Sequence, residues 1–485
     1  YIFGEEIEGS IWWSNDGASL VYATYNDTAI PTHPIKFYGS VEDTLTKTMA
    51  PKIVTQRYPK AGIKEQNPVV KLWYISLNDS NNELREVLAP HEIATQENYL
   101  TFVHWISPTE LIVVWTLRTQ NFSVITSCGQ ENKWACKVIL KLEGNIATLK
   151  NLMNAILVVE DKRLYFLRSP RPDVEHGSYF HISMNKLDEQ NKFPNFITHG
   201  KYDVTKLLAF DSDSNVLYYQ RTATNHREQR HIYKLQLNES NDDQCITCAL
   251  NDGCSYYDAT FSLSAKYYVL QCLGPKVPYS EFWQSEGNKS KCNYFLLCYV
   301  TGHLNHVFHT SEGEQSINDR FAIEWGTYLS SRKEFIYAKI DIDQRDKRNN
   351  DNKFSDHRHN FEIQIDVINQ LVKEMSEIDK TKIAIWGSGL AAFNALSSLA
   401  SDTKNVLQCA IAVAPVTNWR YLDTVTAEYL LGLPLTNDNF APYQKINLLS
   451  KADKLASKKF LVVHGTADGN KMFHVSCCAL LHLSN

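Results

Sequence analysis

The stretch Lys382–Ala392, KIAIWGSGLAA, decides the fold of the second half of the chain. Its apolar tetrapeptide IAIW predicts a short buried strand, which breaks at Gly387 and is followed at once by a helix over Leu390–Leu399. A strand, a tight turn and a helix in this order are the setting of the G-x-S-x-G nucleophile elbow, where small residues let the strand and the helix pack closely. We therefore predict that this stretch forms such an elbow.

The serine of this motif stands one position early. Set on the template, the chain reads G-S-G-L-A from Gly387, so that Gly389 occupies the nucleophile position. The alternative, with Ser388 as nucleophile, would put Trp386 and Leu390 at the two positions that have to be small. The sequence thus predicts an elbow that has kept its shape and lost its chemistry.

Three segments carry a family resemblance: KIAIWG at the elbow, CAIAVAPVTNWRYLDTVTAEYLLGLP at Cys409–Pro434, and LVVHGTADGN at Leu461–Asn470. Together they resemble dipeptidyl peptidase IV and its insect venom relatives, which are serine peptidases of the prolyl oligopeptidase clan. The resemblance implies an extracellular β-propeller followed by an α/β-hydrolase domain. It also implies that a homodimer is a candidate assembly.

Alternating polarity and helical periodicity divide the chain into two parts. Residues 1–307 read as short strands separated by polar turns, which predicts a partial β-propeller whose leading blades lie outside this numbering. Residues 311–485 read as an α/β-hydrolase domain with an incomplete, mostly parallel sheet. We expect a helix at Ile317–Ser330, a strand at Phe335–Ile342, and no room for the family's first hydrolase strands or its C-terminal histidine segment.

Composition excludes several classes of protein. The net charge is −5 over 485 residues, and no basic face for nucleic acid is present. No run of about 18 apolar residues and no basic leader occurs, so any signal or anchor would lie outside this numbering. Nothing in the motifs points to a cofactor or a metal. A zinc interpretation of Cys245-x-x-Cys248 would need a second cysteine pair at ligand spacing, and the sequence has none.

Cysteines and glycosylation sequons favour the secretory pathway. The resemblance implies the disulfides Cys128–Cys136, Cys245–Cys248 and Cys254–Cys272, and it leaves Cys409 unpaired or mispaired with Cys477 or Cys478. N-x-S/T sequons, which are acceptors for N-glycosylation, stand at Asn26, Asn78, Asn121, Asn238 and Asn288. We expect a chain that is secreted or attached to the extracellular face of the plasma membrane.

A serine-hydrolase triad of this fold needs a serine, an acid and a histidine in that chain order. Asp468 matches the family's triad acid, although an Asp after a strand is otherwise most often a turn or capping residue. The histidine should follow a further helix and strand, and seventeen residues of this numbering follow Asp468. His474 and His482 are interpreted as surface or packing residues. No triad histidine is therefore assigned.

The resemblance also marks remnants of a substrate pocket. Val416 and Trp419 match residues that line the family's proline-sized pocket, and Asn470 lies in the same motif as the triad acid. Two tyrosine positions of that pocket read Leu422 and Thr426 here. The adjacent pair Glu5 and Glu6 resembles the carboxylates that grip a substrate's free amino terminus, although adjacent surface glutamates are more often simply solvated.

Three hypotheses for function follow. The chain is a non-catalytic homologue that binds peptides or a membrane or extracellular protein. Alternatively, it is an active serine-type dipeptidyl aminopeptidase that releases X-Pro or X-Ala dipeptides through an acyl-enzyme. The third hypothesis is a truncated product without independent function. The missing nucleophile and histidine favour the first, because loss of the nucleophile or the histidine of the triad costs about 10⁶ in kcat in subtilisin.

Overall fold

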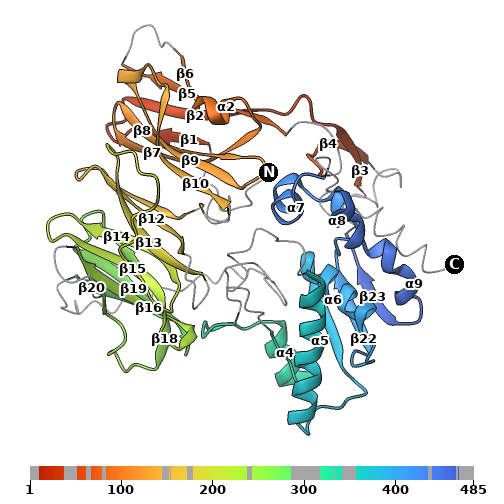
Figure 1. Cartoon of the computed structure of the whole chain (residues 1–485). Coiled ribbons are helices and arrows are strands. Elements are labelled where there is room, and N and C mark those ends of the chain that lie inside the picture. Colours follow the sequence, from red (N-terminus) through yellow and green to blue (C-terminus); the bar gives the residue numbers. More distant parts are fainter. Residues whose placement is uncertain are drawn as a thin grey trace, which may run out of the picture.

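The computed structural model describes residues 10–37, 52–61, 67–78, 84–144, 152, 154–171, 178–237, 243–285, 317–333, 335–340, 357–434, 440–465 and 468. Figure 1 shows two parts. In the first, strand-rich sheets follow one another around an arc. In the second, helices lie beside a small sheet, and α7 faces the first part.

Antiparallel neighbours build the sheets of the first part within the described residues. The first sheet contains β1 (Ile11–Trp13), β2 (Ser19–Asn26), β5 (Val69–Ser76) and β6 (Arg85–Val87), and β3 (Thr32–Phe37) pairs with β4 (Lys52–Arg57) as a separate arm. The second contains β7 (Asn98–Ser107), β8 (Glu110–Leu117), β9 (Phe122–Gly129) and β10 (Cys136–Glu143), with the short helix α2 (His91–Ala94) before it and a 3-10 turn at Gln130–Asn132.

Two further sheets follow along the chain. The third contains β11 (Ile156–Val159), β12 (Leu164–Arg171) and β13 (Tyr179–Lys186). The fourth contains β14 (Val204–Asp211), β15 (Val216–Ala223), β16 (His226–Gln236) and β17 (Asp243–Cys245), and it continues through β18 (Cys254–Phe261), β19 (Tyr267–Pro275) and β20 (Tyr279–Gln284). A parallel bridge between Arg230 and Tyr256 joins β16 to β18. These sheets are propeller-like, as the strand–turn–strand pattern predicted.

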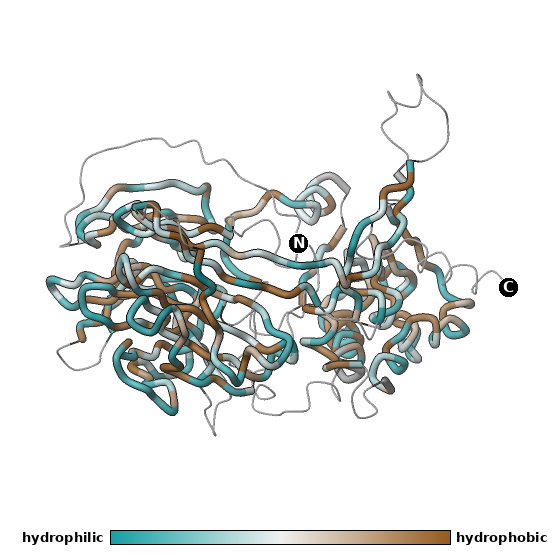
Figure 2. The backbone as a smooth tube through the Cα atoms, turned by 90° about the horizontal axis from the view of Figure 1, so that it is seen from above, coloured by the Kyte–Doolittle hydropathy of each residue, from teal (hydrophilic) through white to brown (hydrophobic). Residues whose placement is uncertain are grey.

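Strand β8, with the sequence ELIVVWTL, shows how neighbouring sheets share their cores. Successive side chains of a strand point to opposite faces. Leu111, Val113 and Trp115 accordingly pack into a core with the first sheet, whereas Ile112 and Val114 pack into a core with the third. Both faces of the strand are buried, so its sequence is apolar from Leu111 to Trp115. Figure 2 shows hydrophobic segments running through the interior of both parts.

The second part is a parallel sheet with helices. Strands β21 (Ala384–Ser388), β22 (Cys409–Val413) and β23 (Lys459–Val463) pair in that order among the described residues. The helices are α4 (Trp325–Lys333), α5 (His357–Glu374), α6 (Leu390–Ser401), α7 (Thr424–Leu431), α8 (Phe440–Lys445) and α9 (Ala452–Leu455), with 3-10 turns at Trp419–Tyr421 and Leu448–Lys451. None of the helices described here is long and apolar enough to span a membrane.

Two expectations for this region were wrong. The helix expected at Ile317–Ser330 begins only at Trp325, because the amides of Asp319 and Phe321 donate to carbonyls of the propeller-like part, those of Glu228 and Leu273. The strand expected at Phe335–Ile342 is not formed over the described residues 335–340. There the chain folds back on α4, and the Phe335 amide donates to the carbonyl of Leu329.

The three disulfides implied by the resemblance are confirmed: Cys128–Cys136, Cys245–Cys248 and Cys254–Cys272. Cys409 is a free thiol in the part of the chain that the structure describes. Its candidate partners Cys477 and Cys478 lie outside the described residues, so their pairing stays a prediction.

Polar contacts join the two parts, made by Arg118 and Gln120 with α7 and by residues 59–61 with residues 422–424; we call this contact region the seam. Arg118, at the end of β8, donates to both carboxylate oxygens of Glu428 on α7 at 2.8 and 2.6 Å. The Glu428 side chain is fully buried and that of Arg118 is 12% exposed. Gln120 donates to the Val425 carbonyl at 2.8 Å. Burial raises the pKa of Glu428, and the hydrogen bonds and charge of Arg118 oppose that rise. Arg118 therefore lowers the cost of a charged carboxylate at this buried position.

We predict that Arg118→Met destabilises the protein by about 3–5 kcal/mol, because removing one partner leaves Glu428 buried and unpaired. The loss should be smaller at acid pH, where the carboxyl of Glu428 takes up a proton and its charge disappears. Chemical denaturation at two pH values measures both effects. Arg163→Met is the matched control: Arg163 pairs with Asp188 and Glu110 near the surface, so its loss should cost less than about 1 kcal/mol. Equal losses for the two variants would show that the seam does not depend on this pair.

Candidate functional site

The sharp turn between β21 and α6 lies at Gly389. Its backbone dihedrals are φ 64° and ψ −119°, a region that residues with a side chain rarely adopt. The Gly389 amide donates to the Val413 carbonyl at 2.9 Å, and its carbonyl accepts from the Phe393 amide at 3.2 Å. Both neighbours thus hold the turn, one from β22 and one from α6. The structure has the strand–turn–helix form of an elbow with a glycine at its apex.

Gly387 is the position where strand and helix touch. A Cβ built there would lie 2.4 Å from the carbonyl carbon and oxygen of Ala391 and 2.8 Å from its Cβ. Gly387 and Ala391 are the first and last positions of the five-residue motif. Their contact explains why both residues are small. It also supports an alignment in which the five-residue motif runs from Gly387 to Ala391.

Ser388 is the last residue of β21 and pairs with Val413 in the parallel sheet. Because side chains alternate across a strand, Ser388 lies on the face opposite to that of Gly387, and therefore away from α6. It is half-buried. Its side chain therefore projects from a face of the sheet at the residue before the apex, whereas an elbow nucleophile is presented at the apex itself.

We predict that Gly387→Ala destabilises the protein by about 3 kcal/mol, since the added methyl group overpacks the contact with the backbone of Ala391. Gly17→Ala is the control. Gly17 has φ +68° and no atom within 4 Å of a built Cβ, so its substitution should cost only the backbone strain of about 1 kcal/mol. Thermal unfolding of both variants measures the difference. A Gly387→Ala variant no weaker than Gly17→Ala would refute the tight contact.

Asp468 lies in the turn after β23, where its amide donates to the Gly465 carbonyl at 3.2 Å. Because β21, β22 and β23 are parallel, the ends of β21 and β23 meet the same edge of the sheet. Two strand spacings separate Gly389 from this turn, or about 10 Å along the edge. The sequence-predicted acid and the elbow are therefore placed at one edge, with β22 between them.

A segment of the propeller-like part reaches this edge. Lys60 forms an antiparallel bridge with Asp423, the Ala61 amide donates to the Leu422 carbonyl at 3.1 Å, and the Thr424 amide donates to the Pro59 carbonyl at 3.2 Å. Burial raises the pKa of the half-buried Tyr58, and the charges of Asp423 and Asp468 raise it further. Tyr58 is therefore a neutral phenol close to the predicted triad acid.

Lys60 is an unusual cation in this seam. It is 4% exposed, and its Nζ lies 5.6 Å from the centre of the Tyr421 ring. Burial lowers the pKa of Lys60 to about 8 from 10.5. A lysine in this environment favours its neutral form more than a solvated lysine does.

We predict that Lys60→Met stabilises the protein at neutral pH, by up to about 3 kcal/mol for the cited pKa difference. The folded protein sheds the Lys60 proton at about pH 8 and the unfolded chain at about 10.5, so the stability of the parent protein should rise between these values. The advantage of Lys60→Met should therefore shrink over that window. Thermal unfolding from neutral to alkaline pH measures it, with Lys71→Met on β5 as the control for loss of a lysine. An advantage that is the same at all pH values contradicts the argument.

The predicted pocket residues are found in the core beside the elbow. Val416, Trp419 and Leu422 are all buried in the same hydrophobic cluster as Phe393 of α6. The rings of Phe393 and Trp419 meet edge to face with centroids 5.2 Å apart. Thr426 is half-buried, and its amide donates to the Asp423 carboxylate that caps α7. Glu5, Glu6, Asn470, His474 and His482 lie outside the described residues.

Sequence reasoning missed the residues that join the two parts. Arg118, Glu428 and Lys60 carry no motif, and their partners lie far away along the chain. Two signals were available: Glu428 is the one charged residue in the helix TVTAEYLL, and Lys60 follows a proline in the phrase YPKAG. A charge inside an apolar helix indicates a buried partner, although it does not identify which residue that is.

Propeller-like sheets followed by a parallel α/β domain with an elbow define the class of prolyl oligopeptidase-type proteins. Comparison with family models agrees: residues 1–279 match the dipeptidyl peptidase IV N-terminal region, and residues 321–482 match the prolyl oligopeptidase family. The chain belongs to the dipeptidyl peptidase IV family.

Individual named proteins of this family are similar to the chain. The chain is 27% identical to prolyl endopeptidase FAP of Bos taurus and 28% identical to dipeptidyl peptidase 4 of Sus scrofa. Each of these matches covers 98% of this chain and 67% of the relative's length. Venom dipeptidyl peptidase 4 of Vespa velutina is 26% identical over 98% of this chain and 66% of its own length. The crystal structure of Porphyromonas gingivalis dipeptidyl peptidase 4 matches with a TM-score of 0.80 at 20% identity, covering all of this chain and 70% of that one.

Proposed function

We propose that this chain is a dipeptidyl peptidase IV-family homologue that does not perform serine-peptidase catalysis at its elbow and acts as an extracellular binding module for peptides or for another protein. The observation that carries the proposal is the glycine at the apex of the elbow. Gly389 holds the turn conformation, with φ 64° and ψ −119°, but it has no hydroxyl group.

The chemical argument concerns the acyl-enzyme. Acyl transfer by this fold needs a serine oxygen at the turn, activated by a histidine base and stabilised as it develops charge. A glycine at the apex cannot form the covalent intermediate. The elbow retains its shape, and Gly389, Asp468 and the Tyr58–Ala61 segment lie at one edge of the sheet. A surface of this kind supports binding without turnover.

The alternative is an active serine-type dipeptidyl aminopeptidase that uses Ser388. Two observations favour it: Ser388 adjoins the apex, and Asp468 lies at the same edge of the sheet. The alternation of side chains along β21 argues against it, because it directs Ser388 to the sheet face away from α6. We therefore rank it second.

An extracellular location is part of the proposal. The three disulfides support it, because such bonds persist in oxidising compartments. Asn26, Asn78 and Asn121 are exposed and open to glycosylation, while Asn238 and Asn288 lie outside the described residues. Binding of a peptide with an N-terminal X-Pro dipeptide, measured by calorimetry, tests the recognition role. The homodimer that the resemblance implies stays a prediction.

We predict that a fluorophosphonate probe does not label the purified protein. The probe requires a serine activated by a base within about 2.6–3.2 Å, and the apex holds Gly389 instead. Hydrolysis of a Gly-Pro chromogenic substrate should likewise stay at background. Labelling is read by mass spectrometry, with Ser388→Ala as the matched control. Stoichiometric labelling at Ser388 that this control abolishes would establish the alternative function.

Gly389→Ser should leave hydrolysis at background, because a serine hydroxyl without a neighbouring base is a weak nucleophile. Gly389→Ala is the control, since it adds the same strain at a positive φ without a hydroxyl group. The two variants should be equally stable, and neither should hydrolyse the substrate above background. A clear gain of turnover in Gly389→Ser alone would show that a histidine already serves as the base, and it would overturn the proposed loss of the catalytic machinery.

A further inference from the structure

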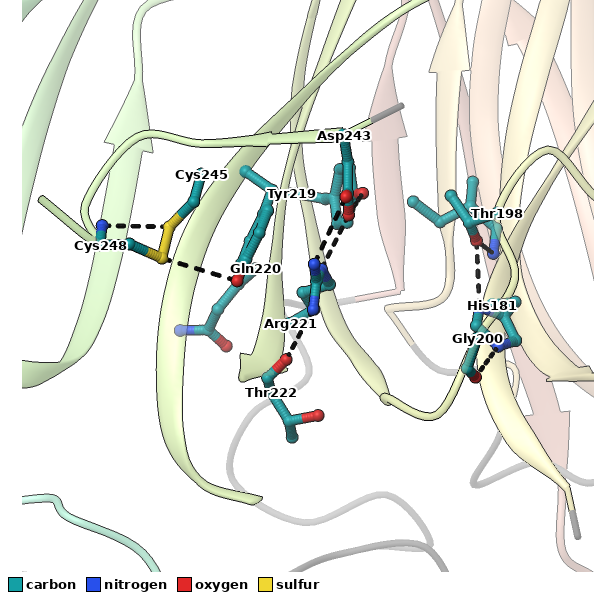
Figure 3. Close-up of polar contacts among 12 residues, drawn as sticks. His181, Thr198, Gly200, Tyr219, Gln220, Arg221, Thr222, Asp243, Cys245 and Cys248 are labelled. Atoms are coloured by element: carbon teal, nitrogen blue, oxygen red, sulfur yellow. Dashed lines mark hydrogen bonds and ion pairs between the residues drawn. A yellow bond between two sulfur atoms is a disulfide. The ribbon is translucent and has the colours of Figure 1, made fainter. Parts of the chain in front are cut away.

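The Cys245–Cys248 disulfide lies beside a buried histidine of the neighbouring strand. Cys245 ends β17 and pairs with Tyr233 of β16, and His231 stands two residues before Tyr233 on β16. One ring nitrogen of His231 and the two cysteine sulfurs all lie within 4.8 Å of one another. Figure 3 shows the disulfide, with the Cys248 amide facing the Cys245 sulfur at 3.0 Å. Three groups that ligate soft and borderline metals thus converge.

This disulfide is the accessible one among the bonds that the structure describes. Cys248 is exposed, whereas Cys128 and Cys272 are completely buried. The other two bonds also cross-link paired strands: Cys136 is in register with Cys128 between β10 and β9, and Cys254–Cys272 joins β18 to β19. Cys245 and Cys248 are separated by only three residues. Closing so short a loop constrains the unfolded chain least, so opening it should leave the sheet intact.

The histidine is already held in place. His231 is 7% exposed, and its Nδ1 lies 3.0 Å from the Thr247 hydroxyl. The same hydroxyl accepts a hydrogen bond from the Ile232 amide at 3.1 Å. Thr247 sits between the two cysteines in the chain, so one short segment carries both sulfurs and the group that orients the imidazole. Hydrogen bonds of this kind fix the rings of metal-binding histidines.

The nearby positive charge is neutralised. Arg221 is sandwiched between the rings of Tyr202 and Tyr233, at 3.8 and 3.7 Å from their centroids. Its Nε donates to the Asp243 carboxylate at 2.8 Å, as Figure 3 shows. Asp243 belongs to β17, two residues before Cys245. The ion pair offsets the repulsion that a lone guanidinium would exert on an incoming cation.

We propose that reduction of the Cys245–Cys248 disulfide by a low-molecular-weight thiol creates a Zn²⁺ site formed by both cysteine sulfurs and the imidazole of His231. Two thiol molecules supply two electrons and two protons and leave as their own disulfide. Zn²⁺ binding then releases the two cysteine protons, because the thiolate is the ligand. Two cysteines and one histidine leave the fourth tetrahedral position for water or another ligand. The site therefore exists only in the reduced protein, and it is independent of the elbow.

Cobalt titration of the whole protein tests the proposal. The protein is treated with a water-soluble phosphine, which reduces the disulfide and leaves as its oxide with oxygen from water, and is then desalted without air. Co²⁺ is added and displaced with Zn²⁺. We expect the reduced protein to bind Co²⁺ with a thiolate-to-cobalt charge-transfer band, and the oxidised protein to show no such band.

Variants identify the ligands. The double variant Cys245→Ser, Cys248→Ser should lose the band, which also controls for the other thiols of the chain. His231→Gln should weaken binding at least about tenfold. His226→Gln on the same strand is the matched control, because His226 is exposed and pairs with Glu228 instead, and it should bind as the parent does. A band that survives in the double variant, or unchanged affinity in His231→Gln, overturns the proposal.

A measurement on the parent sequence keeps the test decisive if His231→Gln folds poorly. Zn²⁺ should slow alkylation of Cys245 and Cys248 in the reduced protein, as read peptide by peptide with mass spectrometry. X-ray absorption at the zinc edge should show both sulfur and imidazole scatterers. Equal alkylation with and without Zn²⁺, or zinc bound by sulfur alone, would contradict the site.

Discussion

A buried ion pair between Arg118 and Glu428 joins the two parts of the molecule. A fully buried carboxylate is tolerated because two guanidinium hydrogen bonds reach it from the other part of the molecule. Helix α7, which carries Glu428, directly follows Asp423, which forms a bridge with Lys60 of the propeller-like part, so two separate contacts hold this segment against that part. The buried carboxylate of Glu428 thus finds its cation only when the two parts are in contact.

Backbone contacts set the geometry of the elbow. The contact between Gly387 and Ala391 sets the approach of strand and helix, and the hydrogen bonds of Gly389 hold the turn. Neither depends on a hydroxyl group at the apex. A glycine avoids the strain that a residue with a side chain experiences at positive φ, so a glycine at position 389 makes the turn easier to form. Selection for a stable fold alone would preserve this geometry.

Features encoded by neighbouring residues could be predicted from the sequence, and features that depend on distant residues could not. The elbow could be read from local sequence order, and the three disulfides followed from the family resemblance. The start of α4 was not, because carbonyls of Glu228 and Leu273 hold the residues before it. His231 likewise reaches the cysteine pair across a strand pairing, which linear spacing does not record.

The sequence distance spanned by the seam has a consequence for synthesis. Arg118 and Glu428 are 310 residues apart, and Gln120 and Val425 are 305 apart. At about 5–20 residues per second, the ribosome needs about 15–60 s to make the second member after the first. If the sheet that carries Arg118 folds during that time, it folds without its partner helix, and its docking surface is then open to chaperones or to other chains. The contact between the two parts can therefore form only after helix α7 has been synthesised.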